Sequence, residues 1–320
     1  MSRMSLQAVS PLVARRVFLA NLVAQVGIVV TGGLVRLTDS GLGCDTWPRC
    51  DSDTRDWTPH EAVSHHAYIE FGNRMLTYVV GAIAVLCVVA AYRMTVRRRD
   101  ITTLSWIQIG TVVGQAVLGG ITVLTDLHPM AVASHLLLSM ALIASAVALY
   151  ERSGEGDAPA RFLVRPEIRW FGYGTLGVAG ALIVIGTVVT GSGPHAGDLK
   201  AKRFDVDIDQ IAWLHADLAF LLLGAAVALA LALRVTDAPQ AAQSRVWWLL
   251  AVLIPQGLIG YIQYFNGLPE WMVLTHMLGA ALTVVTATRT VFALRIRGDQ
   301  PREAADEAEP ETREPVATSY

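Results

Sequence analysis

The sequence predicts an all-α integral membrane protein, with eight transmembrane helices arranged as two tandem four-helix bundles of the same orientation. Hydrophobic residues make up 53% of the 320 residues, and charged residues are concentrated in a few short blocks. Eight apolar runs have about 20 residues each, the length that crosses a hydrocarbon core of about 30 Å. Two pairs of these runs also repeat each other, which indicates a duplicated unit.

Each apolar run is expected to form one membrane-spanning helix. The runs cover residues 17–37, 67–92, 103–124, 131–150, 170–191, 208–233, 246–265 and 271–293. The first run continues into a glycine-rich turn and lacks a clear small-residue cleavage site. We therefore interpret it as a retained helix rather than a signal peptide.

Arginines are concentrated before the first run, after the eighth, and in every second connection between them. The positive-inside rule then predicts a multi-pass membrane protein with both termini in the cytoplasm. Residues 1–16 form the cytoplasmic N-terminal segment. The outer loop 38–64 is long and polar enough to cap the outer end of the helices.

The repeat divides the chain into two halves, 17–150 and 170–294, joined by the charged cytoplasmic linker 151–169. Gln115–Leu138 and Gln256–Gly279 each pass from an apolar segment that begins with Gln, through a short turn, into a second segment with one His. The tail 295–320 is acidic, rich in proline and nearly free of large apolar residues, so we expect it to be disordered.

Four residues occupy matching places in the even-numbered helices. Asn73, His135, His215 and His276 all lie five to eight residues from the outer end, which corresponds to a depth of about 8–12 Å. A neutral imidazole facing the interior of a bundle is the usual axial ligand of heme iron. His215 and His276 are therefore the predicted ligands of one heme, and His135 is the candidate ligand in the first half.

Other uses of these histidines fit less well. A metal-only site would need more Cys, Asp or Glu at the same depth. The inverted-repeat plan of many transporters requires antiparallel halves, whereas a four-helix repeat gives both halves the same orientation.

Three charged residues and two cysteines near the outer end are further candidates. Glu70 and Arg74 lie four residues apart and share one helix face, so Glu70 is either functional or neutralised by a local ion pair. Arg36 either extends to the membrane interface or anchors a carboxylate such as a heme propionate. The spacing of Cys44 and Cys50 permits a disulfide without proving one.

Taken together, six motifs resemble the heme A synthase family of bacteria and mitochondria, over residues 15–295. They are GGLVRLTDSGLGCDTWPRC, EFGNRM, SHLLLSMA, TGSGPHAGD, LHADLAF and THMLGA. The resemblance implies oxidation of the C8 methyl group of heme O to a formyl group, which gives heme A for a terminal oxidase. Heme O would be delivered by heme O synthase, an electron donor would be needed, and membrane lipid would surround the protein. A homo-oligomer is compatible with this reading, and no nucleic-acid partner is expected.

The resemblance also implies roles for residues. The second half would hold heme b between His215 and His276, and the first half would bind the substrate heme. Glu70 would be essential to the chemistry, accepting or delivering protons at the methyl carbon. Cys44 and Cys50 match the paired loop cysteines of many family members.

One position departs from the family pattern. The family usually has His where this chain has Asn73, and an amide is a poor iron ligand. We expect His135 alone to bind the first-half heme, leaving an open position on iron; alternatively, His66 replaces the missing ligand through a helix shift. Arg36 and Arg74 are candidates for propionate contacts.

Two rival functions use the same sequence features. A diheme membrane electron-transfer cytochrome, such as a quinol oxidoreductase, needs the histidines but not Glu70. A heme or small-molecule transporter would change the distribution of its substrate without changing heme chemistry.

Overall fold

The computed structural model describes residues 8–50 and 65–298. Within them are eight helices and two short strands: α1 Pro11–Leu37, α2 His65–Arg93, α3 Arg99–Leu124, α4 Pro129–Ser153, β1 Arg161–Phe162, α5 Pro166–Ser192, α6 Ile208–Val235, α7 Gln240–Phe265, α8 Glu270–Phe292 and β2 Arg295–Ile296. All eight helices are long and apolar enough to cross a membrane. Each predicted span lies on one helix, although α1 and α7 begin six residues before their predicted spans. The all-α prediction is confirmed.

The helix starts follow local sequence signals. Pro11, Pro129 and Pro166 begin α1, α4 and α5, where the missing N–H of proline costs no helical hydrogen bond. Asp207 caps α6, because its side chain accepts hydrogen bonds from the backbone N–H groups of Asp209 and Gln210.

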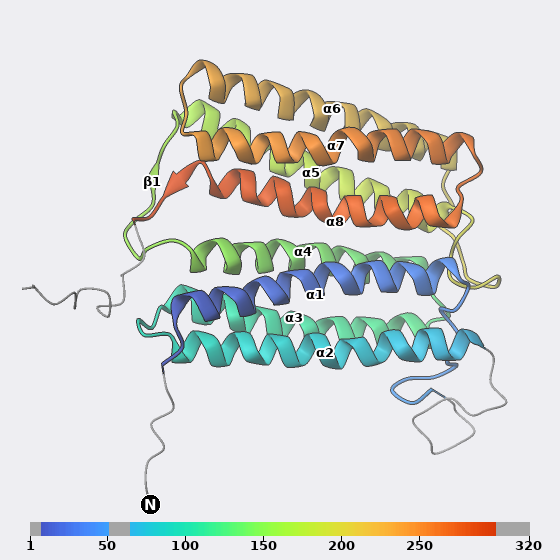
Figure 1. Ribbon diagram of the computed structural model, residues 1–320. Helices are drawn as coiled ribbons and strands as arrows, with labels where there is room; N and C mark the ends of the chain where they lie inside the picture. The colour runs from blue at the N-terminus through green and yellow to red at the C-terminus, as the bar shows by residue number, and fades with distance from the viewer. Residues whose placement is uncertain (1–7, 51–64, 299–320) are drawn as a thin grey trace, which may run out of the picture.

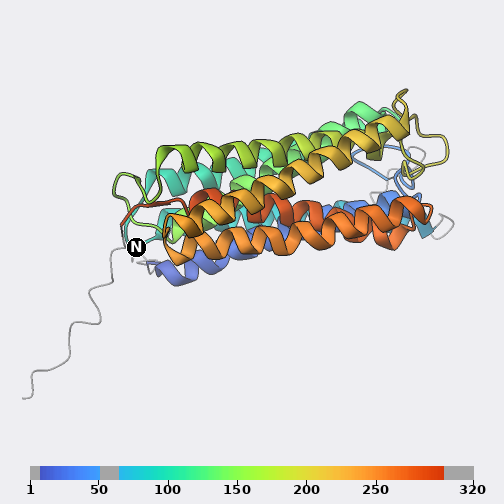
Figure 2. The same cartoon turned by 90° about the horizontal axis from the view of Figure 1, so that it is seen from above.

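The helices of each half contact one another in the same pattern (Figure 1). α1 and α3 each pack against α2 and α4, and α5 and α7 each pack against α6 and α8. The halves meet where α8 lies against α1 and α4, and where α4 lies against α5. α1 and α5 both begin at the left of Figure 1, and Figure 2 shows all the helices lying along one common direction. We call the end that carries residues 38–50 the outer end.

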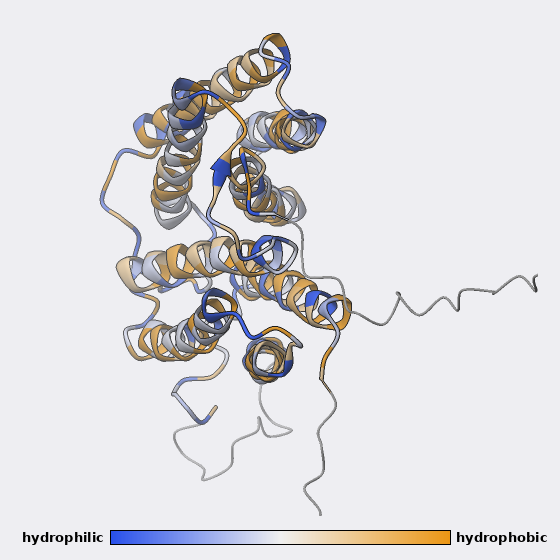
Figure 3. Cartoon of the chain, turned by 90° about the vertical axis from the view of Figure 1, so that its left-hand side faces the viewer, coloured by the Kyte–Doolittle hydropathy of each residue, from blue (hydrophilic) through white to orange (hydrophobic). Residues whose placement is uncertain are grey.

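The outward faces of the helices are apolar. Trp213, Phe220 and Tyr261 are 64%, 68% and 64% exposed. Figure 3 shows hydrophobic residues along the helices, with many of the hydrophilic ones near helix ends and connections. This surface suits contact with lipid chains.

The two strands pair antiparallel, and β1 is part of the linker between the halves. Arg161 pairs with Ile296, and the backbone N–H of Leu163 donates to the carbonyl of Leu294 at 2.9 Å. Leu294 is buried against α5, where a Cβ at Gly172 would lie 2.6 Å from its Cδ1. The predicted start of the disordered tail at residue 295 is therefore too early, because the chain is ordered by this packing and pairing through β2. Residues 299–320 of the tail, and 51–64 of the predicted outer loop, lie outside the described residues.

A polar layer crosses the interior of the first half at mid-depth. The amide of Asn21 on α1 donates to Gln108 Oε1 on α3 at 2.9 Å, and Gln108 Nε2 donates to Ser145 Oγ on α4 at 2.9 Å. Asn21 and Gln108 are fully buried. When the two halves are aligned so that Gln115 matches Gln256, Gln108 matches the buried Leu249. The second half therefore lacks this hydrogen-bonded link.

Replacing Gln108 with leucine is expected to lower the free energy of unfolding by about 1–2 kcal/mol. The change removes two interhelical hydrogen bonds and leaves the buried Asn21 amide without its partner. Denaturant titration of the detergent-solubilised protein measures this difference. Gln240→Leu, at the exposed start of α7, is the matched control; an equal loss of stability in both variants would contradict a specific role for the layer.

The two halves are also joined by charged side chains at the end opposite the outer one. Glu151 on α4 accepts a hydrogen bond from Arg289 Nε on α8 and lies 3.6 Å from Arg245 Nη2 on α7. Half-buried ion pairs of this kind fix the alignment of the helices more than they add stability.

Candidate functional site

Two histidines face each other inside the second half. The ring centres of His215 on α6 and His276 on α8 are 6.3 Å apart, and the ring planes are inclined by 67°. Each ring lies against a glycine of the preceding helix: a Cβ would come within 2.7 Å of His215 Cε1 at Gly186, and within 3.0 Å of His276 Cε1 at Gly260. The missing side chains at these two glycines make room for the imidazoles.

This pair fits the axial ligands of a heme. Two metal–imidazole bonds of about 2 Å, with roughly 1 Å from each nitrogen to its ring centre, give a separation of about 6 Å. Both Nδ1 atoms are buried without a partner of hydrogen-bond geometry, although the carbonyls of Leu182 and Gln256 lie beside the two rings. Within residues 8–50 and 65–298, no three or more His, Cys, Asp or Glu side chains are grouped so that they could hold a metal ion.

The structure explains the Gln–His spacing of the repeat. Gln256 Nε2 donates to the backbone carbonyl of His276 at 2.7 Å, and Gln115 Nε2 donates to that of His135 at 3.2 Å. Gln115 also donates to Ser139 Oγ at 2.8 Å. The paired glutamines therefore hold the histidine-bearing turns of α4 and α8 against α3 and α7.

In the first half, His135 and Asn73 occupy the corresponding places. A Cβ at Gly119 would lie 3.4 Å from His135 Cε1, and a Cβ at Gly32 would lie 3.9 Å from Asn73 Nδ2. His135 Nδ1 is buried without a hydrogen-bond partner. A glycine of the preceding helix therefore faces the functional side chain at all four places.

Glu70 joins α2 to the loop that follows α1. Its side chain is 6% exposed, and Oε2 accepts a hydrogen bond from the backbone N–H of Cys44 at 2.8 Å. Oε1 accepts from Nε and Nη2 of Arg74. Arg74 Nη1 donates to the carbonyls of Thr46 and Arg49 at 2.9 and 3.1 Å. Sequence reasoning anticipated the Glu70–Arg74 pair but missed its contacts with the loop.

The loop itself is closed by a disulfide between Cys44 and Cys50, so the predicted pairing is confirmed. Both cysteines are buried together with Ala67 of α2. Trp47 reaches α3, where a Cβ at Gly120 would lie 2.7 Å from the indole. The loop therefore packs over the outer ends of α2 and α3.

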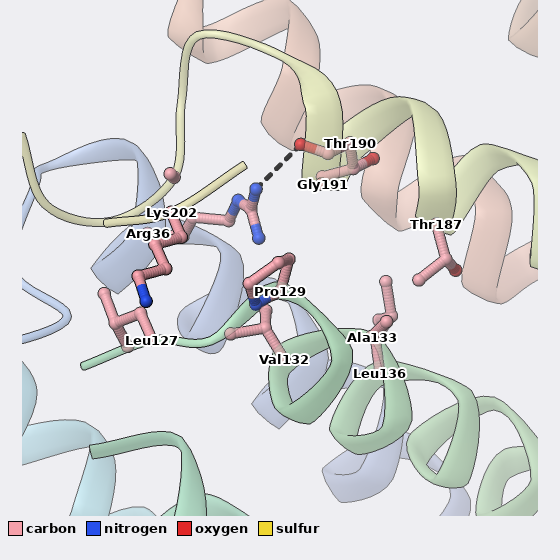
Figure 4. A pocket seen from close by; sticks show the side chains of 11 residues that line it. Arg36, Leu127, Pro129, Val132, Ala133, Leu136, Thr187, Thr190, Gly191 and Lys202 are labelled. Carbon is pink, nitrogen blue, oxygen red and sulfur yellow. Dashed lines mark hydrogen bonds between the residues drawn. The ribbon is translucent and has the colours of Figure 1, made fainter. Parts of the chain in front are cut away.

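Arg36 extends from α1 to the second half. Its Nε donates to the carbonyl of His195 at 2.6 Å, and its Nη2 donates to that of Thr190 at 2.8 Å. Arg36 and Lys202 line a small pocket (Figure 4). Residues at the start of α4 and at the end of α5 form other parts of its wall. Arg36 thus joins the halves at their outer end, a contact that the sequence did not reveal.

His66, the alternative ligand considered for the first half, is held elsewhere. Its Nδ1 lies 2.9 Å from the hydroxyl oxygen of Ser40, at the outer start of α2. A Cβ at Gly43 would lie 2.5 Å from the carbonyl of His66, so loop and helix are in close contact there. A shift of α2 that brought His66 to the level of Asn73 would break this packing.

Comparison with known proteins yields several relatives of this chain. It is 29% identical over 148 residues to the heme A synthase of Lysinibacillus sphaericus (strain C3-41), covering 45% of this chain and 47% of that protein. It is 30% identical over 159 residues to the heme A synthase of Symbiobacterium thermophilum, covering 48% of each chain. The matched part thus spans about half the length of these curated relatives.

A broader match covers both halves. The family model COX15-CtaA, described as cytochrome oxidase assembly protein, matches residues 15–288. These residues include all eight helices, apart from a few residues at the start of α1 and at the end of α8. The chain therefore belongs to the COX15-CtaA family of cytochrome oxidase assembly proteins.

Proposed function

We propose that this protein is a heme A synthase, which oxidises the C8 methyl group of heme O to a formyl group and so supplies heme A for cytochrome oxidase. The observation that carries the proposal is the facing pair His215 and His276, with a matching site at His135 and a buried carboxylate, Glu70, on α2 of the same half. The family membership and the names of the relatives support it.

The second half holds heme b between His215 and His276 in this proposal. Bis-imidazole heme supplies one-electron transfer when bound. The protein's part is to orient the two rings through the glycine contacts at Gly186 and Gly260, and to exclude water with the surrounding apolar side chains. Dioxygen would be the oxidant of the methyl group, and the electrons that complete its reduction to water would come from a donor outside this chain.

The first half binds heme O, the substrate, through His135. Glu70 lies one helical turn outward from Asn73 on the same face of α2. Its carboxylate would accept or deliver a proton at the methyl carbon as it is oxidised. Arg74 and the Cys44 amide hold both oxygens of Glu70 in the present arrangement, so a proton on this carboxylate competes with these hydrogen bonds.

Of the two arginines considered for propionates, Arg36 is the better candidate. All three guanidinium nitrogens of Arg74 have partners, namely Glu70 and two loop carbonyls. Arg36 Nη1 has no hydrogen-bond partner within residues 8–50 and 65–298. It adjoins the pocket shown in Figure 4, which also contains Lys202.

We also propose that the protein lies in the bacterial cell membrane with both termini in the cytoplasm and receives its substrate from heme O synthase. The alternation of arginine-rich connections supports this orientation.

Pigment extraction tests the proposed activity. The full chain is expressed in membranes that make heme O but no heme A, and acid–acetone extracts are separated by chromatography. We expect heme A in the extract, and heme O alone in membranes without the protein. Recovery of heme O alone, from membranes in which the protein carries its hemes, would overturn the activity.

One observation favours the rival electron-transfer cytochrome. Both oxygens of Glu70 accept hydrogen bonds from Arg74 or Cys44, as a carboxylate with only a structural role would. The rival predicts quinol-dependent reduction of the hemes with no change in extracted pigments. The same membranes, supplied with a reduced quinol, distinguish the two functions.

A further inference from the structure

The four matching places are not chemically equal. His135, His215 and His276 each place Cε1 against a glycine of a neighbouring helix. At the fourth place the glycine is kept, as Gly32, but the side chain against it is the amide of Asn73. The first half therefore retains the space of the second half and lacks one of its two imidazoles.

The Asn73 amide presents its oxygen to Thr31 of α1. The Thr31 hydroxyl donates to Asn73 Oδ1 at 2.8 Å, and the same hydroxyl lies 3.2 Å from the carbonyl of Ile28. The carbonyl end of the amide is thus turned toward α1. Nδ2 is the end left without a hydrogen-bond partner in the described part of the chain.

An amide nitrogen is a poor metal ligand because its lone pair is delocalised into the carbonyl, whereas its two N–H groups are good hydrogen-bond donors. Two nearby side chains do not replace the missing imidazole. His66 is held by Ser40 at the outer start of α2. Met277 lies against Gly33, the neighbour of Gly32 on a different face of α1.

We propose that the first half has a binding site for a small uncharged diatomic ligand, on the heme face opposite His135, with Asn73 Nδ2 as the hydrogen-bond donor to that ligand and Thr31 as the residue that orients the amide. This inference rests on the proposed function, because it requires a heme at His135. In this proposal only the first-half heme can bind such a ligand, because His215 and His276 would occupy both available positions on the iron of the second-half heme.

Carbon monoxide is the probe. The purified full-length protein is saturated with iron protoporphyrin, reduced with dithionite and exposed to carbon monoxide. We expect about half of the bound heme to take up carbon monoxide, and His135→Ala to abolish that fraction. Asn73→His, which installs the residue found at the other three places, is expected to reduce the fraction at least tenfold with no loss of bound heme.

The infrared stretching band of the bound carbon monoxide tests the donor. Hydrogen bonding to its oxygen lowers the stretching frequency, so Asn73→Leu is expected to move the band upward while binding persists. Thr31→Val is expected to broaden the band, because the amide is then free to rotate. A band that stays unchanged in Asn73→Leu would overturn the donor role.

The matched control is His276→Asn, which gives the second half the residue pair of the first. It is expected to lower the occupancy of the second-half heme and to open the heme that remains there to carbon monoxide. A protein that binds two hemes, neither of which takes up carbon monoxide, would overturn the inference and leave the proposed function standing. A protein that binds only one heme, unaffected by His135→Ala, would overturn the first-half heme site of the proposed function, and the inference with it.

Discussion

Replacing His276 with alanine is expected to empty the second-half heme site, lowering its occupancy at least tenfold and the heme content of the saturated protein by about half. The change removes one of two axial bonds to iron and leaves a cavity against Gly260. The pyridine hemochrome assay gives heme per protein, and the visible bands of the ferrous protein report the loss of low-spin, bis-imidazole heme.

His215→Ala should have the same effect, because the two rings face each other at 6.3 Å and act on one site. The double variant should lose no more heme than either single variant, which is the signature of a shared site. His128→Ala is the control, since His128 is at the outer start of α4 and its side chain accepts a hydrogen bond from the backbone N–H of Met130. Unchanged low-spin heme in His276→Ala would remove the pair from its proposed role.

Replacing Glu70 with glutamine should lower heme A formation at least a hundredfold while the spectrum of the second-half heme stays intact. Glutamine keeps the size of the side chain and an acceptor for the Cys44 N–H, but it cannot exchange a proton in the way a carboxylate does. Heme A is measured in extracts of membranes that supply heme O, normalised to the amount of protein.

The position of Glu70 requires a control for loop packing, because the same carboxylate holds Arg74 and the disulfide loop. Arg74→Gln removes the ion pair and the donors to Thr46 and Arg49 but keeps the Glu70 carboxylate. If loop packing alone matters, Arg74→Gln lowers heme A formation as much as Glu70→Gln does. Heme A formation at the normal level in Glu70→Gln would exclude Glu70 from the chemistry.

Much of the architecture follows from local properties of the sequence. Each of the eight helices is an apolar run of the length that a membrane requires, and their bounds are marked by residues such as Pro11, Pro129 and Asp207. The boundary at residue 295 was placed wrongly because the composition of the tail changes there, whereas Leu294 and β2 are held by packing against α5.

The candidate site was partly predictable for a related reason. A polar residue in an apolar helix is conspicuous, so His135, His215, His276 and Glu70 could be found from composition and helical spacing. The contacts of Arg36 with the carbonyls of Thr190 and His195 could not be found in this way, because backbone acceptors have no sequence signature.

The sequence by itself determined that this chain has eight membrane-spanning helices in two similar halves, with imidazoles at one depth. Only the tertiary structure decided that His215 and His276 face each other, that glycines make room for each ring, and that Glu70 binds the disulfide loop. Helix formation and membrane insertion depend on local hydrogen bonding and hydrophobicity. Which faces of different helices meet depends on the packing of residues far apart in the chain.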